Sequence, residues 1–194
     1  MMLVTILLVG DIMTGRGIDQ VLSYSCSPEL HESYVRSAYD YVELAENASG
    51  SISKPVTYSY VWGDALPVFW DPSVNVRIAN LETSITTSAD YWKGKGIHYR
   101  MHPKNITCLT ASGVDCYTLA NNHVLDWGQA GLEQTLESLR IAAVAFAGGG
   151  KNIVEAASPA IIEIADQGRV VVFAIGVESS GITKSWGATI RSPC

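Results

Sequence analysis

The chain of 194 residues is 47% hydrophobic and 16% charged. This composition excludes a disordered tail and indicates one globular domain that is long enough to bury a sizeable core. A formal net charge of −6 and the scattered Lys and Arg residues argue against a nucleic-acid-binding surface. An acidic protein of this kind attracts divalent cations instead.

The apolar segment at residues 1–9 is predicted to be the first core strand. It lacks the basic start and the small-residue cleavage site of a signal peptide, and it runs directly into Gly10 and Asp11. Its uniform apolar character predicts that a strand over residues 3–10 is buried on both sides. No segment approaches the roughly 20 apolar residues that a transmembrane helix needs.

Further along the chain, helical and strand patterns alternate. Helices are expected over residues 17–22, 28–47, 62–70 and 103–112, and from Gln129 onward. Strands are expected over residues 3–10, 74–79, 114–120 and 145–147, followed by a hairpin of residues 160–165 and 170–175. Strand–helix–strand units followed by a hairpin are typical of an α/β sandwich.

Three of the expected strands end in side chains that can bind metal ions. The first strand ends at Asp11, the second is followed by Glu82, and the third by Asn122, His123 and Asp126. Open α/β sheets bind ligands at the carboxyl ends of their strands. Oxygen-rich clusters with an imidazole suit Mg, Mn, Fe or Zn, and two such ions can clamp a phosphoryl group and activate water.

Each of these residues also has a structural interpretation. Asp11 could cap the helix at residues 17–22, and Asp126 could cap the helix that begins near Gln129. Asn122 could stabilise a tight turn. Glu82 could be a solvated loop residue, and His123 a hydrogen-bonded turn residue. Their joint occurrence at three strand ends favours a site.

Two glycine-containing turns are weak candidates for phosphate binding. Gly10 and Gly15 have the spacing of a phosphate-binding loop, but Arg16 and Gly17 stand where that loop needs Lys and then Ser or Thr. The basic turn at residues 93–96 is predicted to be a solvated loop.

Taken together, the motifs resemble the bacterial capsule synthesis, or poly-gamma-glutamate biosynthesis, family of the CapA type. The resemblance extends from about Leu3 to about Ile175, with the motifs in the family's order. It is carried by Gly10-Asp11-Ile12-Met13 with Gly15-Arg16-Gly17, Asn80-Leu81-Glu82-Thr83, Leu119-Ala120-Asn121-Asn122-His123, the segment Tyr99–Pro103 and the turn Ala147–Asn152.

That family is similar in fold to calcineurin-like metallophosphoesterases. The resemblance therefore implies a metallophosphatase-like β-sandwich flanked by helices, with divalent Mn, Fe, Zn or Mg ions as cofactors. It implies that Asp11, Glu82 and Asn122 bind metal and that His123 is the acid/base or phosphate-polarising residue. Arg100 would orient an anion, with an ordinary surface arginine as the alternative.

One departure from the fold concerns its later histidines. Proteins of this fold take further metal-binding histidines from their second half, whereas the last histidine here is His123. We therefore expect residues 1–194 to be the N-terminal part of one capsule-synthesis domain, truncated at its C-terminus. The expected consequences are an incomplete dinuclear site, an unpaired sheet edge, an exposed apolar face and an irregular tail at residues 176–194, in which Trp186 lacks its packing partner.

The function implied by the resemblance is a part in making or exporting an anionic polymer such as capsule or poly-gamma-glutamate. Metal-dependent phosphoester hydrolysis would be its chemistry, with the polymer or a phosphoester as substrate. The alternative is a non-catalytic structural or interaction component of a polymer synthesis or export complex. Members of the family are often membrane-associated or exported, so the cellular location stays open.

Overall fold

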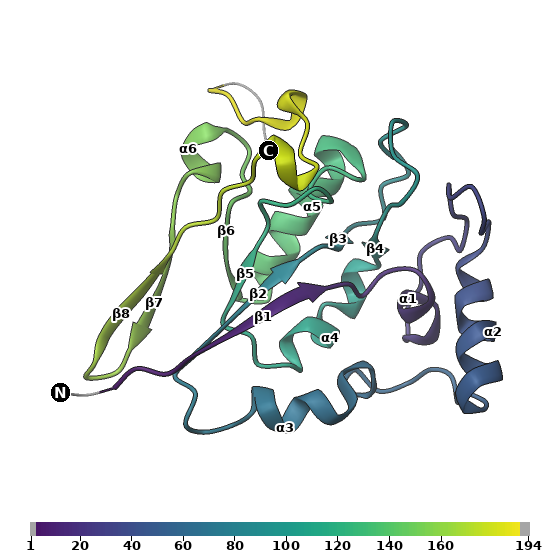
Figure 1. Cartoon of the computed structure of the whole chain (residues 1–194), viewed down its shortest axis with the longest axis horizontal. Helices are drawn as coiled ribbons and strands as arrows, with labels where there is room; N and C mark the ends of the chain where they lie inside the picture. The colour runs from purple at the N-terminus through teal and green to yellow at the C-terminus, as the bar shows by residue number, and fades with distance from the viewer. Residues whose placement is uncertain (1–2, 191–194) are drawn as a thin grey trace.

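The computed structural model describes residues 3–190, which form a four-stranded sheet between a layer of helices and a β-hairpin (Figure 1). The strand order is β1-β2-β5-β6, and every neighbouring pair is parallel. The bounds are Ile6–Ile12 for β1, Val76–Leu81 for β2, Cys116–Thr118 for β5 and Ala145–Ala147 for β6. All four strands therefore place their carboxyl ends at one edge of the sheet.

The remaining elements connect and cover these strands. The helices are α1 (Gly17–Val21), α2 (Ala38–Ser49), α3 (Leu66–Phe69), α4 (Thr107–Thr110), α5 (Gly128–Ile141) and α6 (Ile153–Ala156). Short 3-10 turns are η1 (Tyr60–Ala65), η2 (Pro103–Asn105), η3 (Glu178–Ser180) and η4 (Lys184–Trp186). A small parallel pair joins β3 (Ser84–Ile85) to β4 (Arg100–Met101), and β7 (Ala160–Ile164) pairs with β8 (Gly168–Val172) as an antiparallel hairpin. The mixed α/β architecture and the hairpin are as predicted.

The two faces of the sheet contact different layers because side chains alternate along each strand. Ala79 and Tyr117 pack into the main core, together with Leu132, Leu136 and Leu139 of α5. Their neighbours Ile78 and Cys116 face the opposite way and pack against apolar side chains of β7 and β8. The hairpin is thus a second β layer over part of the sheet.

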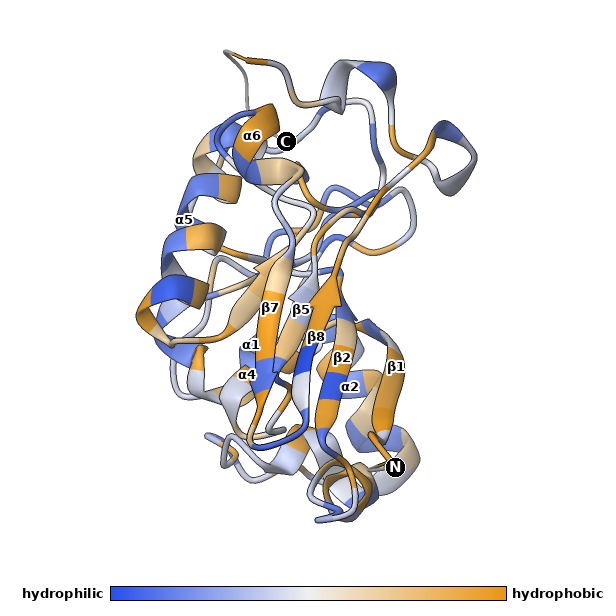
Figure 2. Cartoon of the chain, turned by 90° about the vertical axis from the view of Figure 1, so that its left-hand side faces the viewer, coloured by the Kyte–Doolittle hydropathy of each residue, from blue (hydrophilic) through white to orange (hydrophobic). Residues whose placement is uncertain are grey.

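The hairpin leaves the outer face of β1 uncovered, so the prediction that this strand is buried on both sides is wrong. Leu7 and Val9 pack against the main core, whereas Leu8 is 74% exposed and Ile6 42%. Figure 2 shows apolar residues along β1 and in the strands of the hairpin. Phe173, directly after β8, is 64% exposed. The structure therefore has the exposed apolar face expected from the sequence.

Residues 173–190, after the hairpin, are irregular apart from η3 and η4, but their tryptophan is well packed. Residues 191–194 of the expected tail lie outside the described residues. Trp186 is 1% exposed and lies edge-on to Trp92, with 5.2 Å between ring centroids. The expectation that Trp186 lacks a packing partner is therefore wrong. Among residues 3–190, no helix is long and apolar enough to cross a membrane.

Candidate active site

The carboxyl edge of the sheet brings together Asp11, Glu82 and His123. Asp11 pairs with Asn80 in the β1–β2 register, and the Asn80 amide donates to Asp11 Oδ1 at 2.8 Å and to Glu82 Oε1 at 3.2 Å. His123 Nε2 lies 3.7 Å from Glu82 Oε2. Two carboxylates and an imidazole therefore form one polar cluster, as the strand-end motifs predict.

A pair of asparagines determines how this cluster is held. Asn121 Nδ2 donates to Asn80 Oδ1 at 3.0 Å and to the Leu81 carbonyl at 2.8 Å, while its own Oδ1 accepts from the His123 amide at 2.9 Å. The turn-stabilising role considered for Asn122 thus belongs to its neighbour Asn121. These bonds tie the loop after β5 to the end of β2 and orient His123.

His123 forms a close pair with a wholly buried carboxylate. Its Nδ1 lies 2.7 Å from Asp126 Oδ2, and the exposed fraction of the Asp126 side chain is 0%. The same carboxylate oxygen accepts from the Tyr99 amide at 2.8 Å. An acceptor at Nδ1 favours the tautomer that leaves Nε2 free to accept a proton or a metal ion.

The capping interpretation of both aspartates is wrong. The N-cap of α5 is Trp127 and that of α1 is Arg16, and neither helix has a side-chain cap. Asp126 uses both oxygens within the cluster, and Asp11 bonds to Asn80 across the sheet.

Lys95, in the basic turn predicted to be a solvated loop, is a partly buried partner of this pair. Its Nζ lies 2.5 Å from Asp126 Oδ1 and 3.2 Å from His123 Nδ1, and it also donates to the Asn122 carbonyl. The ammonium balances the charge of the buried carboxylate. The sequence carries no local signal for this contact, because Lys95 and Asp126 are 31 positions apart.

The electrostatics of the cluster focus on Glu82. Burial raises the pKa of Glu82 above its usual value, the nearby His123 opposes this, and the charge of Asp11 raises it again. The hydrogen bond from Asn80 favours the ionised form. A carboxyl group with a raised pKa beside an imidazole is a common feature of sites that move protons.

Two predicted site residues, Arg100 and Asn122, make no side-chain hydrogen bond to the cluster within residues 3–190. Arg100 stacks on Trp127, 3.8 Å from the ring centroid, and donates to the carbonyls of Ser88 at 2.6 Å and Ser27 at 3.4 Å. In the described part of the chain, the Asn122 amide has no hydrogen bond to Asp11, Glu82 or His123. Another arginine lies closer, because Arg16 stacks on Tyr99, whose ring lies 4.4 Å from that of His123.

The donor chemistry of the cluster suits a hard or borderline divalent cation, since it combines two carboxylates with an imidazole. In this geometry, however, the Asn80 amide lies between the two carboxylates and donates to both. Within residues 3–190, no three His, Cys, Asp or Glu side chains form a group that could hold a metal ion. The donor types fit a metal ion, but the arrangement is not a closed coordination sphere.

Fold and site together define an α/β protein with a His–Asp pair and acidic residues at the carboxyl edge of a parallel sheet. The model of the Bacterial capsule synthesis protein PGA_cap family matches residues 5–192. The chain belongs to this family.

Similar proteins agree with this assignment. The chain is 41% identical over 190 residues to a Probable polyglutamine synthesis accessory protein of Mycobacterium tuberculosis, covering 98% of this chain and 50% of that protein. It is 23% identical over 150 residues to the Capsule biosynthesis protein CapA of Bacillus anthracis, covering 76% of this chain and 29% of that protein. The chain thus spans half or less of the length of these relatives.

Proposed function

We propose that this protein acts in capsule or polyglutamate synthesis through a phosphoester-hydrolysing site centred on His123. The observation that carries the proposal is the pairing of His123 with the buried Asp126, beside Asp11 and Glu82. A buried carboxylate at Nδ1 orients an imidazole and stabilises its protonated form, so Nε2 can take a proton from water or give one to a leaving group.

The residues around His123 support this role. Lys95 holds Asp126 in place and puts a positive charge beside this wholly buried side chain. Glu82, with its raised pKa, lies on the Nε2 side of the imidazole, 3.7 Å from that nitrogen. Tyr99 packs against the imidazole ring and limits its rotation.

A divalent cation at Asp11 and Glu82, with His123 or Asn122 as a further ligand, is part of the proposal. Such an ion would lower the pKa of bound water and neutralise the charge of a phosphoryl group. Asn80 would then have to release the two carboxylates, because its amide nitrogen is a donor and cannot ligate. A metallophosphatase-like β-sandwich is the corresponding proposal for the fold.

Hydrolysis of an aryl phosphate such as 4-nitrophenyl phosphate, assayed with and without Mn²⁺, tests the function. We expect activity only with the added ion, and we expect His123→Ala to lower kcat by about 10²-fold or more while changing metal affinity less. Leu8→Ala is a matched control, because Leu8 is an exposed residue of β1 outside the cluster. Equal turnover by the wild type and His123→Ala would refute the proposal.

The second candidate is a non-catalytic component of a polymer-synthesis complex. It is favoured by the open ligand geometry among residues 3–190 and by the word "accessory" in the name of the mycobacterial relative. Metal analysis of the purified protein separates the two functions. Stoichiometric metal that Asp11→Asn with Glu82→Gln removes supports the hydrolase, whereas no bound metal and no activity in excess Mn²⁺ supports the accessory role.

A further inference from the structure

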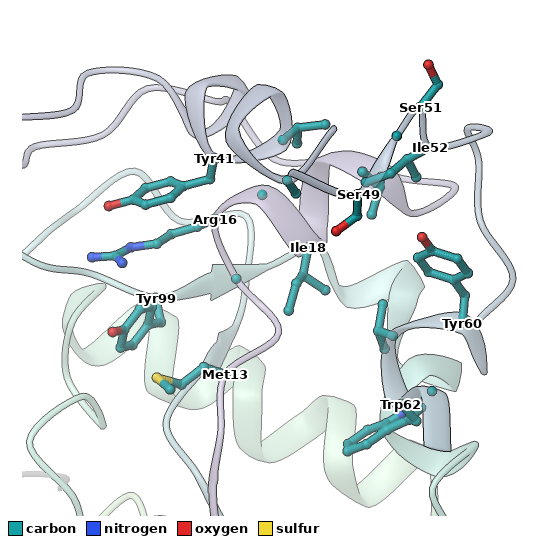
Figure 3. A pocket seen from close by; sticks show the side chains of 18 residues that line it. Met13, Arg16, Ile18, Tyr41, Ser49, Ser51, Ile52, Tyr60, Trp62 and Tyr99 are labelled. Atoms are coloured by element: carbon teal, nitrogen blue, oxygen red, sulfur yellow. The ribbon is translucent and has the colours of Figure 1, made fainter. Parts of the chain in front are cut away.

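A cavity of about 680 Å³ lies between α1, α2 and the turn η1, next to the His123 site but separate from it (Figure 3). Its volume is in the range of small-molecule binding sites. Tyr99 connects the two places, since it lines the cavity and also packs against His123. A molecule in the cavity would therefore lie one aromatic ring away from the imidazole.

The lining of the cavity is largely apolar and aromatic. Ile18 and Trp62 point into it, and Tyr60 with Ser49 places hydroxyl groups at its far end (Figure 3). Among the described residues that line it, Arg16 is the one charged side chain, and no carboxylate is present. In a chain of net charge −6, the cavity thus combines apolar surface with one cationic side chain.

Arg16 is held in a fixed position at the end of the cavity nearest Tyr99. Its guanidinium lies between the rings of Tyr41 and Tyr99, 4.9 Å from each centroid (Figure 3). One nitrogen lies 2.6 Å from the buried Glu32, whereas Nε is buried without a hydrogen-bond partner in the described part of the chain. A guanidinium with unused donors is a suitable partner for a phosphate group.

The backbone at Arg16 supports a positional role. Arg16 has φ +54°, a conformation that a residue with a side chain rarely adopts, and it directly precedes α1. This strained backbone directs the side chain into the stack between Tyr41 and Tyr99. Strain of this kind persists where the surrounding structure enforces it and is often found at functional sites.

We propose that the cavity binds the apolar body of a small phosphate monoester, whose phosphate group contacts Arg16 beside Tyr99. The binding-site part of this proposal depends only on the cavity and on Arg16. The further statement that the phosphate monoester is the substrate of the His123 site rests on the proposed function. It predicts that a phosphate ester with an apolar alcohol binds more tightly than either of its parts.

Calorimetric titration with octyl phosphate, octanol and inorganic phosphate tests the binding site in the presence of a chelator, which removes any contribution from metal. We expect octyl phosphate to bind at least about tenfold more tightly than octanol and about 100-fold more tightly than inorganic phosphate. Equal affinities of octyl phosphate and octanol would refute the role of Arg16. Equal affinities of octyl phosphate and inorganic phosphate would refute the cavity.

A pair of variants on α2 locates the binding. Ala45 lines the cavity, whereas its neighbour Leu44 is 61% exposed and does not. Ala45→Phe should raise the Kd of octyl phosphate at least about tenfold, and Leu44→Phe should change it less than about twofold, provided that both variants keep the wild-type Tm. Equal effects would place the ligand elsewhere and overturn the proposal.

The hydrolysis assay separates the two proposals. Octyl phosphate could bind, with an affinity that Ala45→Phe lowers, and yet not be hydrolysed. That result would support the cavity as a binding site and would show that its ligand is not the substrate of the His123 site. Hydrolysis of 4-nitrophenyl phosphate and octyl phosphate with equal KM, unaffected by Ala45→Phe, would retain the function and reject the cavity.

Discussion

Replacing Asp126 by Asn tests the most tightly determined part of the site. The side chain keeps its shape, but one carboxylate oxygen becomes an NH₂ group and the negative charge is lost. The remaining oxygen can keep the bonds from His123 Nδ1 and the Tyr99 amide, because both go to Oδ2. The NH₂ group must then face Lys95 Nζ, which is 2.5 Å from Oδ1 in the wild type.

The cost of this change follows from that contact. Two donors at hydrogen-bond distance repel, and Lys95 loses its charged partner while retaining the Asn122 carbonyl. A lost charge-assisted bond costs about 1.5–3 kcal/mol, and breaking a buried pair about 3–5 kcal/mol. Lys95 is 21% exposed and can turn towards water, so we expect a loss of about 2–4 kcal/mol. In a chain of this length, that lowers Tm by roughly 4–16 °C.

Thermal and urea unfolding of a double-mutant cycle measure this interaction. Lys95→Met alone should also destabilise, since it leaves the wholly buried Asp126 without its cation. The double variant should lose about 2 kcal/mol less unfolding free energy than the sum of the losses of the two single variants, because both charges are removed together. Additive losses would mean that Lys95 and Asp126 do not interact, and would contradict the close contact between these two side chains.

Three further predictions concern the surroundings of the site. Glu82→Gln should stabilise the protein increasingly as the pH rises. The pKa of Glu82 is raised in the folded protein, so its contribution to stability is fully present below pH 4.5 and is lost as the pH rises through the folded pKa. A Tm difference between variant and wild type that does not change with pH would contradict this. Gly148→Ala should lower the free energy of unfolding by about 2–4 kcal/mol in urea denaturation, because Gly148 has φ +84° and an added Cβ would lie 2.7 Å from two neighbouring side chains. Gly10→Ala is the control and should have little effect, because the space around Gly10 is open. Trp186→Ala should lower the free energy of unfolding by about 3–5 kcal/mol in the same assay. Ile190→Ala, at a residue 83% exposed, should change it by less than about 0.5 kcal/mol. Equal effects would show that the segment containing Trp186 does not pack as described.

Local patterns predicted the strands and predicted that Asp11, Glu82 and His123 lie together at their ends. The apolar runs before Asp11 and Glu82 are strands of one parallel sheet, and parallel pairing alone brings their carboxyl ends together. The face that each strand buries could not be predicted in the same way. β1 reads as a buried strand, but its outer face is exposed because the hairpin, more than 145 residues later in the chain, covers β2, β5 and β6 instead.

The interactions of the histidine show where local reasoning ends. Asp126 lies three positions after His123, a spacing that allows contact within one turn of chain, but it also matches the N-cap of the following helix. Lys95 decides between these interpretations. Its ammonium, which lies in a turn predicted to be solvated, and the Tyr99 amide both donate hydrogen bonds to the Asp126 carboxylate. A buried charge needs its counter-charge, and that partner can come from any part of the chain that the fold brings near. The strand-end motif therefore identifies where the site is, whereas the residues that orient and balance His123 become visible only in three dimensions.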